Sequence, residues 1–194
     1  FFGLCAYGLI RVIQKSTAFT NRIPIWRPWK GLLGGLILVG LTLTFSRAYL
    51  GLGLDLLENC IKGQPVAFYT FLLKALFTVI TLSISRSGSV ITPILFIGAT
   101  AGSFYADVVG ADRSTFAAIG FVSLLAGAAN TPIACSILAI ELFGGEVAPY
   151  ASVGCVISFL LSGHRSLYGS QVLTISKSSA IKANLGEEIS TVST

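Results

Sequence analysis

Charged residues are scarce in this chain of 194 residues. Only 11% of the residues are Asp, Glu, Lys or Arg, about half the share that a soluble domain carries. Hydrophobic residues make up 54%, and the mean hydropathy is +0.83. This composition predicts a polytopic membrane protein. The net charge of +5 comes from scattered basic residues without interleaved aromatics, so we expect no nucleic-acid binding.

Side chains that usually bind metals or perform catalysis are also rare. The chain has one histidine, His164, and four cysteines, and the cysteines lie far apart without a Cys-x-x-Cys pair: Cys5, Cys60, Cys135 and Cys155. Cysteine in an apolar segment usually behaves as a small buried hydrophobic residue. We therefore expect no metal, no cofactor and no enzymatic activity, although an intramembrane enzyme and a structural membrane subunit stay as alternatives from other classes.

Methionine is absent, even at position 1, and the chain opens on the apolar run Phe1-Phe2-Gly3. This beginning predicts an internal fragment whose start lies upstream. Parts of a functional site can then lie outside this sequence.

The most informative feature is an interrupted apolar segment at residues 86–102. A Gly/Ser-rich turn, with Gly88 and Ser89, precedes Pro93 and a run of apolar residues. Inside a bilayer such a break is costly, because the freed backbone groups find no water, and it persists where it lines a cavity. A helix N-terminus at that cavity offers N–H donors and a positive dipole end to an anion. The break therefore predicts an anion pathway.

The apolar segments have uneven lengths, and several are shorter than the roughly 20 residues needed to cross a bilayer. They run over residues 1–13, 31–45, 65–84, 90–110, 115–143 and 147–161. This pattern predicts an all-α fold with tilted and re-entrant helices. Small residues at helix-packing spacing predict close helix contacts at Gly31 with Gly35, at Gly98 with Gly102, and along residues 126–129.

Two ionisable residues lie inside apolar segments. Glu141 belongs to a helix predicted over residues 132–143, with Asn130 or Thr131 as its N-cap. Its carboxylate has either a functional role or a structural one, accepting hydrogen bonds from neighbouring backbone near the membrane face. Lys74 must extend to the membrane surface or face protein, and the sequence does not indicate its partner.

Three motifs occur in the order known from one family. They are Ser-Gly-Ser-Val-Ile-Thr-Pro at 87–93 with Leu-Phe-Ile-Gly at 95–98, Ala-Asn-Thr-Pro-Ile at 129–133 with Ile-Glu-Leu at 140–142, and Ser-Gly-His-Arg-Ser-Leu-Tyr at 162–168. With them the chain resembles the CLC chloride channels and chloride/proton antiporters. The resemblance covers residues 1–182, the C-terminal half of a subunit and one half of its inverted repeat, and leaves a polar tail at 183–194.

The resemblance implies an anion site made by a tyrosine hydroxyl and main-chain N–H groups at a helix start. The anion-binding residues would be Val90, Ile91 and Tyr168, and the supporting turn would include Gly88, Ser89 and Pro93. Ser89 replaces the family's glycine, Ile91 its phenylalanine, and Asn130 a common Arg or Lys. These departures indicate a divergent branch. The family's anion-facing serine and gating glutamate belong to the half that precedes this sequence.

The resemblance implies transport of chloride or another small anion, by channel conduction or by exchange with protons. A fluoride/proton antiporter of the same family is the alternative. We expect a multi-pass protein of the plasma (inner) membrane that forms a homodimer in the lipid bilayer through residues 132–143 and the helix around 150–161. The sequence does not decide whether the protein is a channel or an antiporter, or whether it selects chloride or fluoride.

Overall fold

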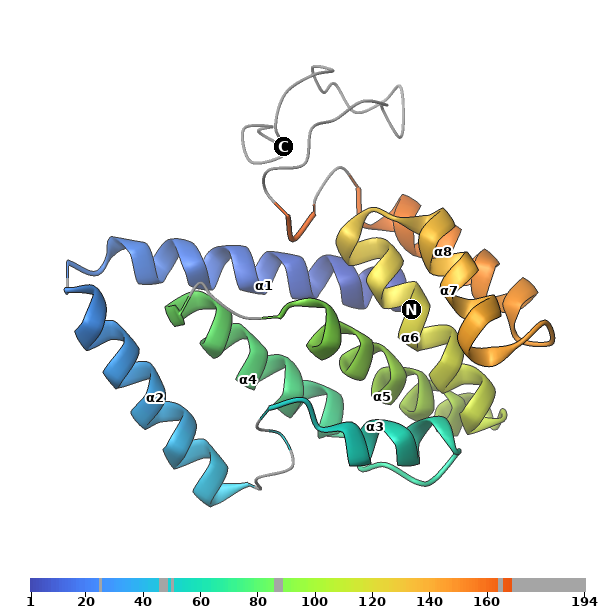
Figure 1. Ribbon diagram of the computed structural model, residues 1–194, viewed down its shortest axis with the longest axis horizontal. Helices are drawn as coiled ribbons and strands as arrows, with labels where there is room; N and C mark the ends of the chain where they lie inside the picture. The colour runs from blue at the N-terminus through green and yellow to red at the C-terminus, as the bar shows by residue number, and fades with distance from the viewer. Residues whose placement is uncertain (25, 46–48, 50, 86–88, 164–165, 169–194) are drawn as a thin grey trace, which may run out of the picture.

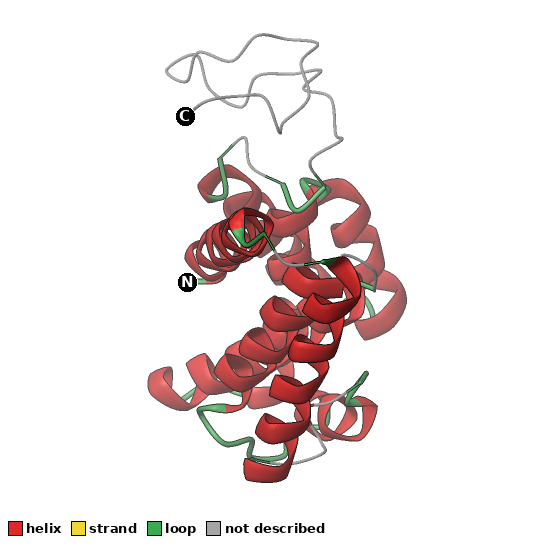
Figure 2. Cartoon of the chain, turned by 90° about the vertical axis from the view of Figure 1, so that its left-hand side faces the viewer, coloured by secondary structure: helices red, strands yellow, loops and turns green. Residues whose placement is uncertain are grey.

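The structure, a computed structural model, describes residues 1–24, 26–45, 49, 51–85, 89–163 and 166–168. These residues form eight α-helices and no strand (Figures 1 and 2). The helices are α1 (Phe2–Arg22), α2 (Arg27–Thr44), α3 (Leu54–Ile61), α4 (Thr70–Ser85), α5 (Ile91–Val109), α6 (Arg113–Ala129), α7 (Pro132–Phe143) and α8 (Ala148–Leu161).

Helices α5 and α6 form the centre of the molecule. Helix α5 is the one described helix with the length and apolarity to cross a membrane. Helices α1 and α4 pack beside this pair, α7 and α8 cover α6, and α2 contacts α4 at the opposite end of the molecule (Figure 1). The all-α fold with helices of uneven length is as expected from the sequence.

The turn between α5 and α6 follows ordinary helix-end chemistry. Gly110 ends α5 with a φ of 71°, a left-handed conformation that glycine adopts without strain. Asp112 then caps α6, because its carboxylate accepts a hydrogen bond of 2.7 Å from the Thr115 N–H. A hydrogen bond from the Thr115 hydroxyl, together with the one from the Thr115 N–H, lowers the pKa of the Asp112 carboxyl below its ordinary value.

Glycines bring α5 and α6 into backbone contact. A Cβ atom on Gly98 would overlap the carbonyl oxygen of Gly120, and one on Gly102 would overlap that of Phe116. The predicted contact at Gly98 and Gly102 is therefore confirmed. Such spacing lets two helices approach closely where lipid provides no hydrophobic driving force.

Helices α6 and α8 interlock through serine and glycine in a reciprocal pattern. Ser123 of α6 lies against Gly154 of α8, and Ser158 of α8 lies against Gly127 of α6. The two positions on each helix are four residues apart, and the numbers rise together along both helices, so α6 and α8 run parallel here with their small residues in register. Gly127 belongs to the small-residue run expected to pack.

Helix α2 departs from the predicted packing. Gly31 and Gly35 have nothing within 4 Å of the place a Cβ would take, counting the described residues. The glycine of α2 in contact is Gly34, which lies against the side chain of Ile84 on α4. The predicted close contact at Gly31 and Gly35 is therefore wrong among the described residues.

The apolar segment 115–143 is divided by a turn. Asn130 adopts a left-handed conformation, with φ of 59°, and ends α6, and α7 then begins at Pro132 as predicted. Thr131 occupies the N-cap position without the expected side-chain cap; its hydroxyl instead lies 3.6 Å from the sulfur of Cys135. Proline at the first helical position makes the cap less necessary, because one N–H that would need a partner is absent.

Candidate anion site

The N-terminal end of α5 carries the predicted anion turn. Val90 occupies the N-cap position, Ile91 is the first helical residue, and the first hydrogen bond of the helix runs from the Ile94 N–H to the Val90 carbonyl over 3.3 Å. No described side chain caps this end. The N–H groups of Val90 and Ile91 therefore stand at the positive end of the helix dipole, where an anion is stabilised.

The surroundings of this turn differ from those of the rest of α5. Ser89 and the Ile91 side chain are exposed, and Val90 is half-buried. Farther along, α5 is buried between its neighbours, with Ile94 and Phe96 fully enclosed. Helix α5 thus points an open N-terminal end out of a packed core. Gly88, the other predicted member of the turn, lies outside the described residues.

Tyr168 lies at the edge of the same core. It is half-buried and packs on the hydrophobic cluster that Val90 also contacts. Its backbone N–H donates a hydrogen bond of 3.1 Å to the Ser166 hydroxyl. Within the described part of the chain the Tyr168 hydroxyl has no hydrogen-bond partner. The two predicted components of the site therefore border one core, each with a donor group available.

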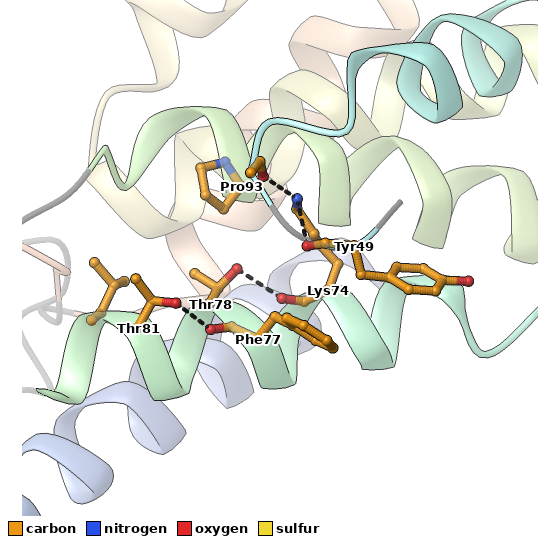
Figure 3. A pocket seen from close by; sticks show the side chains of 8 residues that line it. Tyr49, Lys74, Phe77, Thr78, Thr81 and Pro93 are labelled. Atoms are coloured by element: carbon orange, nitrogen blue, oxygen red, sulfur yellow. Dashed lines mark hydrogen bonds between the residues drawn. The ribbon is translucent and has the colours of Figure 1, made fainter. Parts of the chain in front are cut away.

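Lys74 has backbone partners that the sequence did not indicate. Its side chain is 2% exposed, and its Nζ donates hydrogen bonds to the carbonyl oxygens of Tyr49, over 3.2 Å, and Gly51, over 2.6 Å (Figure 3). The Nζ also lies 4.9 Å from the ring centroid of Phe96 on α5. The ammonium group therefore ties the segment before α3 to both α4 and α5.

A cavity of about 120 Å³ adjoins Lys74 and Pro93 (Figure 3). Its threonine hydroxyl groups already donate to the backbone: Thr78 to the Lys74 carbonyl and Thr81 to the Phe77 carbonyl. With the Lys74 ammonium bound to two carbonyls and placed over a ring, few donors remain for a ligand. We assign Lys74 a structural role rather than a place among the anion ligands.

Glu141 lies near the C-terminal end of α7 and is exposed. Its carboxylate makes no hydrogen bond with the described residues, so the expected backbone donors are not found in this part of the chain. Its role in the membrane stays a prediction.

Comparison with known proteins identifies the family to which the chain belongs. A family model described as voltage gated chloride channel matches residues 1–163. A chloride/fluoride channel protein of Pseudomonas syringae pv. tomato is 35% identical over 183 residues, which cover 91% of this chain and 40% of the relative. A voltage-gated ClC-type chloride channel, ClcB, of Escherichia coli is 30% identical over 172 residues, 82% of this chain and 41% of the relative.

A solved structure also matches, that of a CLC-type fluoride/proton antiporter, with a TM-score of 0.81 and 28% identity. The match covers 86% of this chain and 42% of that one, so the chain spans about two-fifths of the length of the proteins it resembles.

The helical fold and the hydropathy define an integral membrane protein built from uneven, interrupted helices. The chain belongs to the voltage-gated chloride channel, or CLC, family. The resemblance inferred from the three motifs is confirmed, and so is the fold class as one half of the CLC architecture.

Proposed function

We propose that the full-length protein transports a small inorganic anion, chloride in the first place, by channel conduction or by exchange with protons. The observation that carries this proposal is the uncapped N-terminal end of α5 at Val90 and Ile91. Partial positive charges on N–H groups hold a halide without a full countercharge, so the ion binds and still leaves. The Tyr168 hydroxyl adds one neutral donor.

The proposal is tested by four variants of the full-length protein, with halide binding measured by calorimetry and folding checked separately. Tyr168→Phe removes one neutral donor and keeps the ring, so affinity should fall only several-fold, by about 0.5–1.5 kcal/mol. Tyr168→Ala should lower affinity further, because it also opens the pore wall. Ile91→Ala should change little, whereas Ile91→Pro should abolish binding by deleting the N–H donor.

One pattern of results would contradict this mechanism. If Tyr168→Ala leaves affinity and selectivity unchanged while Ile91→Ala removes binding, the side chain at position 91 is the ligand. The main-chain mechanism would then be wrong.

Fluoride/proton exchange is the second candidate function. It is favoured by the names of a relative and of the matching structure, which mention fluoride, and by the departures at Ser89, Ile91 and Asn130. Liposomes loaded with chloride or fluoride, with flux followed by ion-selective electrodes, separate the two. Fluoride efflux that brings protons into the lumen and acidifies it in proportion, with little chloride efflux, would favour the antiporter.

We further propose a homodimer in the plasma (inner) membrane, with α7 and α8 at its interface. Apolar side chains are exposed at helical spacing on α7, at Ile133, Ile137 and Ile140, and on α8, at Val153 and Ile157. Single cysteines along residues 147–161 of the full-length protein should crosslink into dimers. A monomer in mild detergent would contradict this arrangement. Residues 1–182 would form the transmembrane half, and 183–194 a polar tail.

A further inference from the structure

The junction between α6 and α7 leaves a backbone carbonyl without its helical partner. In a continuous helix the N–H of residue 132 would bond to the carbonyl of Ala128. Residue 132 is Pro132, which has no N–H, and Asn130 has already turned the chain out of the helix. The Ala128 carbonyl is therefore available to another segment.

The segment before Tyr168 uses this carbonyl. The Leu167 N–H donates to the Ala128 carbonyl over 3.0 Å, and the Ser166 hydroxyl donates to the same oxygen over 3.4 Å. Residues 166–168 are thus attached to the C-terminal end of α6, although they lie 38 residues farther along the chain.

Ser166 connects this attachment to Tyr168 itself. Its hydroxyl oxygen accepts the Tyr168 N–H over 3.1 Å while its proton is directed at Ala128. Its own carbonyl accepts a hydrogen bond of 3.4 Å from the Gln14 side chain on α1. Ser166 is 1% exposed, so water does not replace these contacts.

We propose that Ser166 is a positioning residue for the anion site: its hydroxyl fixes the backbone of Tyr168 to α6, and so fixes where the tyrosine hydroxyl meets the anion. This inference rests on the proposed function. Removal of the Ser166 hydroxyl leaves the bond from Leu167 to Ala128, so the segment stays attached while Tyr168 loses its restraint. The anion affinity, rather than the fold, should respond.

The test compares Ser166→Ala with wild type in the full-length protein, with chloride and fluoride binding measured by calorimetry. We expect affinity to fall about threefold to tenfold, comparable to the loss of one neutral hydrogen bond. In a Tyr168→Phe background, where the donor that Ser166 positions is absent, Ser166→Ala should change affinity by less than about twofold. Ser166→Thr, which keeps a hydroxyl, should recover part of the affinity.

Ser158→Ala is the matched control. Ser158 is also a serine with 1% exposure, but its hydroxyl has no hydrogen-bond partner among the described residues. Its removal should leave affinity unchanged. If Ser166→Ala does not fold, Gln14→Leu on the exposed side of α1 provides the second arm: a smaller loss of affinity, absent in the Tyr168→Phe background, is expected.

The outcomes separate the two proposals. A wild-type protein that binds neither halide would overturn the proposed function itself. Wild-type binding that is unchanged in Ser166→Ala, or in Gln14→Leu where that arm is used, would overturn only the positioning role. An equal loss in the wild-type and Tyr168→Phe backgrounds would overturn it as well, since Ser166 would then act through another group.

Discussion

Substitution of Lys74 by methionine tests how much the hydrogen bonds from its ammonium group to the carbonyls of Tyr49 and Gly51 stabilise the fold. Methionine keeps the apolar chain of Lys74 over the ring of Phe96 and deletes the ammonium that binds two carbonyls. The Tyr49 residue is buried, so its carbonyl loses a donor that water cannot replace, at a cost of about 1–3 kcal/mol. Gly51 is exposed, and its carbonyl can turn to water at a smaller cost.

One energetic contribution opposes this loss of stability. A buried ammonium carries a desolvation penalty of several kcal/mol, and methionine removes it. Because the ammonium is bound at two carbonyls and over a ring, we expect the lost contacts to exceed the gain. The free energy of unfolding should fall by about 2 kcal/mol, which lies within the range for breaking a buried polar contact.

The assay is reversible unfolding of the full-length protein in mixed micelles, followed by circular dichroism as the denaturing detergent fraction rises. Lys62→Met is the matched control, since the side-chain partner of Lys62 among the described residues is the exposed Glu58, over 2.5 Å, and its loss should matter far less. Lys74→Arg should retain most of the stability, because a guanidinium also donates to carbonyls. A Lys74→Met protein as stable as wild type, or more so, would refute the reasoning.

Two further predictions concern helix packing and capping, with unfolding measured in the same way. Gly102→Ala should lower the free energy of unfolding by about 1–3 kcal/mol, since its Cβ would overlap the Phe116 carbonyl. Gly31→Ala, with open space around it, should not destabilise the protein. Equal effects of the two substitutions would contradict the close α5–α6 crossing. Asp112→Ala should cost about 1 kcal/mol through loss of the α6 cap. The Asp112 pKa is lowered on folding, so the stabilisation that this carboxylate provides is present above its unfolded pKa of about 3.9 and is lost as the pH falls through the folded pKa. Asp112→Asn should flatten that pH dependence.

The sequence predicted best where proline and glycine interrupt apolar runs. Pro132 marked the start of α7 at the correct residue, because its missing N–H is tolerated only at a helix beginning. The break at residues 86–93 likewise placed Val90 and Ile91 at the start of α5. These residues act on the local backbone, and local effects are visible without tertiary structure.

Elements with polar faces were harder to predict. Helix α3 (Leu54–Ile61) is short and carries Asp55 and Glu58, so no apolar segment indicated it. Helix α1 continues to Arg22, well past the apolar segment that ends at residue 13. Because its second half is polar, the apolar pattern did not indicate that part of the helix. The length of an apolar segment indicates how much of a helix contacts lipid or the protein core. A helix can continue beyond that segment where it contacts neither.

Contacts made by backbone carbonyls could not be predicted at all. The partners of Lys74 are the carbonyls of Tyr49 and Gly51, and every residue has the same group, so no side-chain pattern distinguishes them. The choice of Gly34 rather than Gly31 for packing on α4 has a similar origin. It depends on the rotation of α2 about its axis, which the positions of its glycines in the sequence do not determine.

Main-chain groups are partners at three of the polar contacts in this half of the protein. The α5 end presents N–H groups, the α6 end presents the Ala128 carbonyl, and Lys74 is neutralised by carbonyl dipoles rather than by a carboxylate. In the proposed mechanism this explains why the family's glycine and phenylalanine can be Ser89 and Ile91 here, since neither change removes an N–H donor. Selectivity between chloride and fluoride should then depend on where those N–H groups and the Tyr168 hydroxyl are held, and therefore on the contacts that fix them.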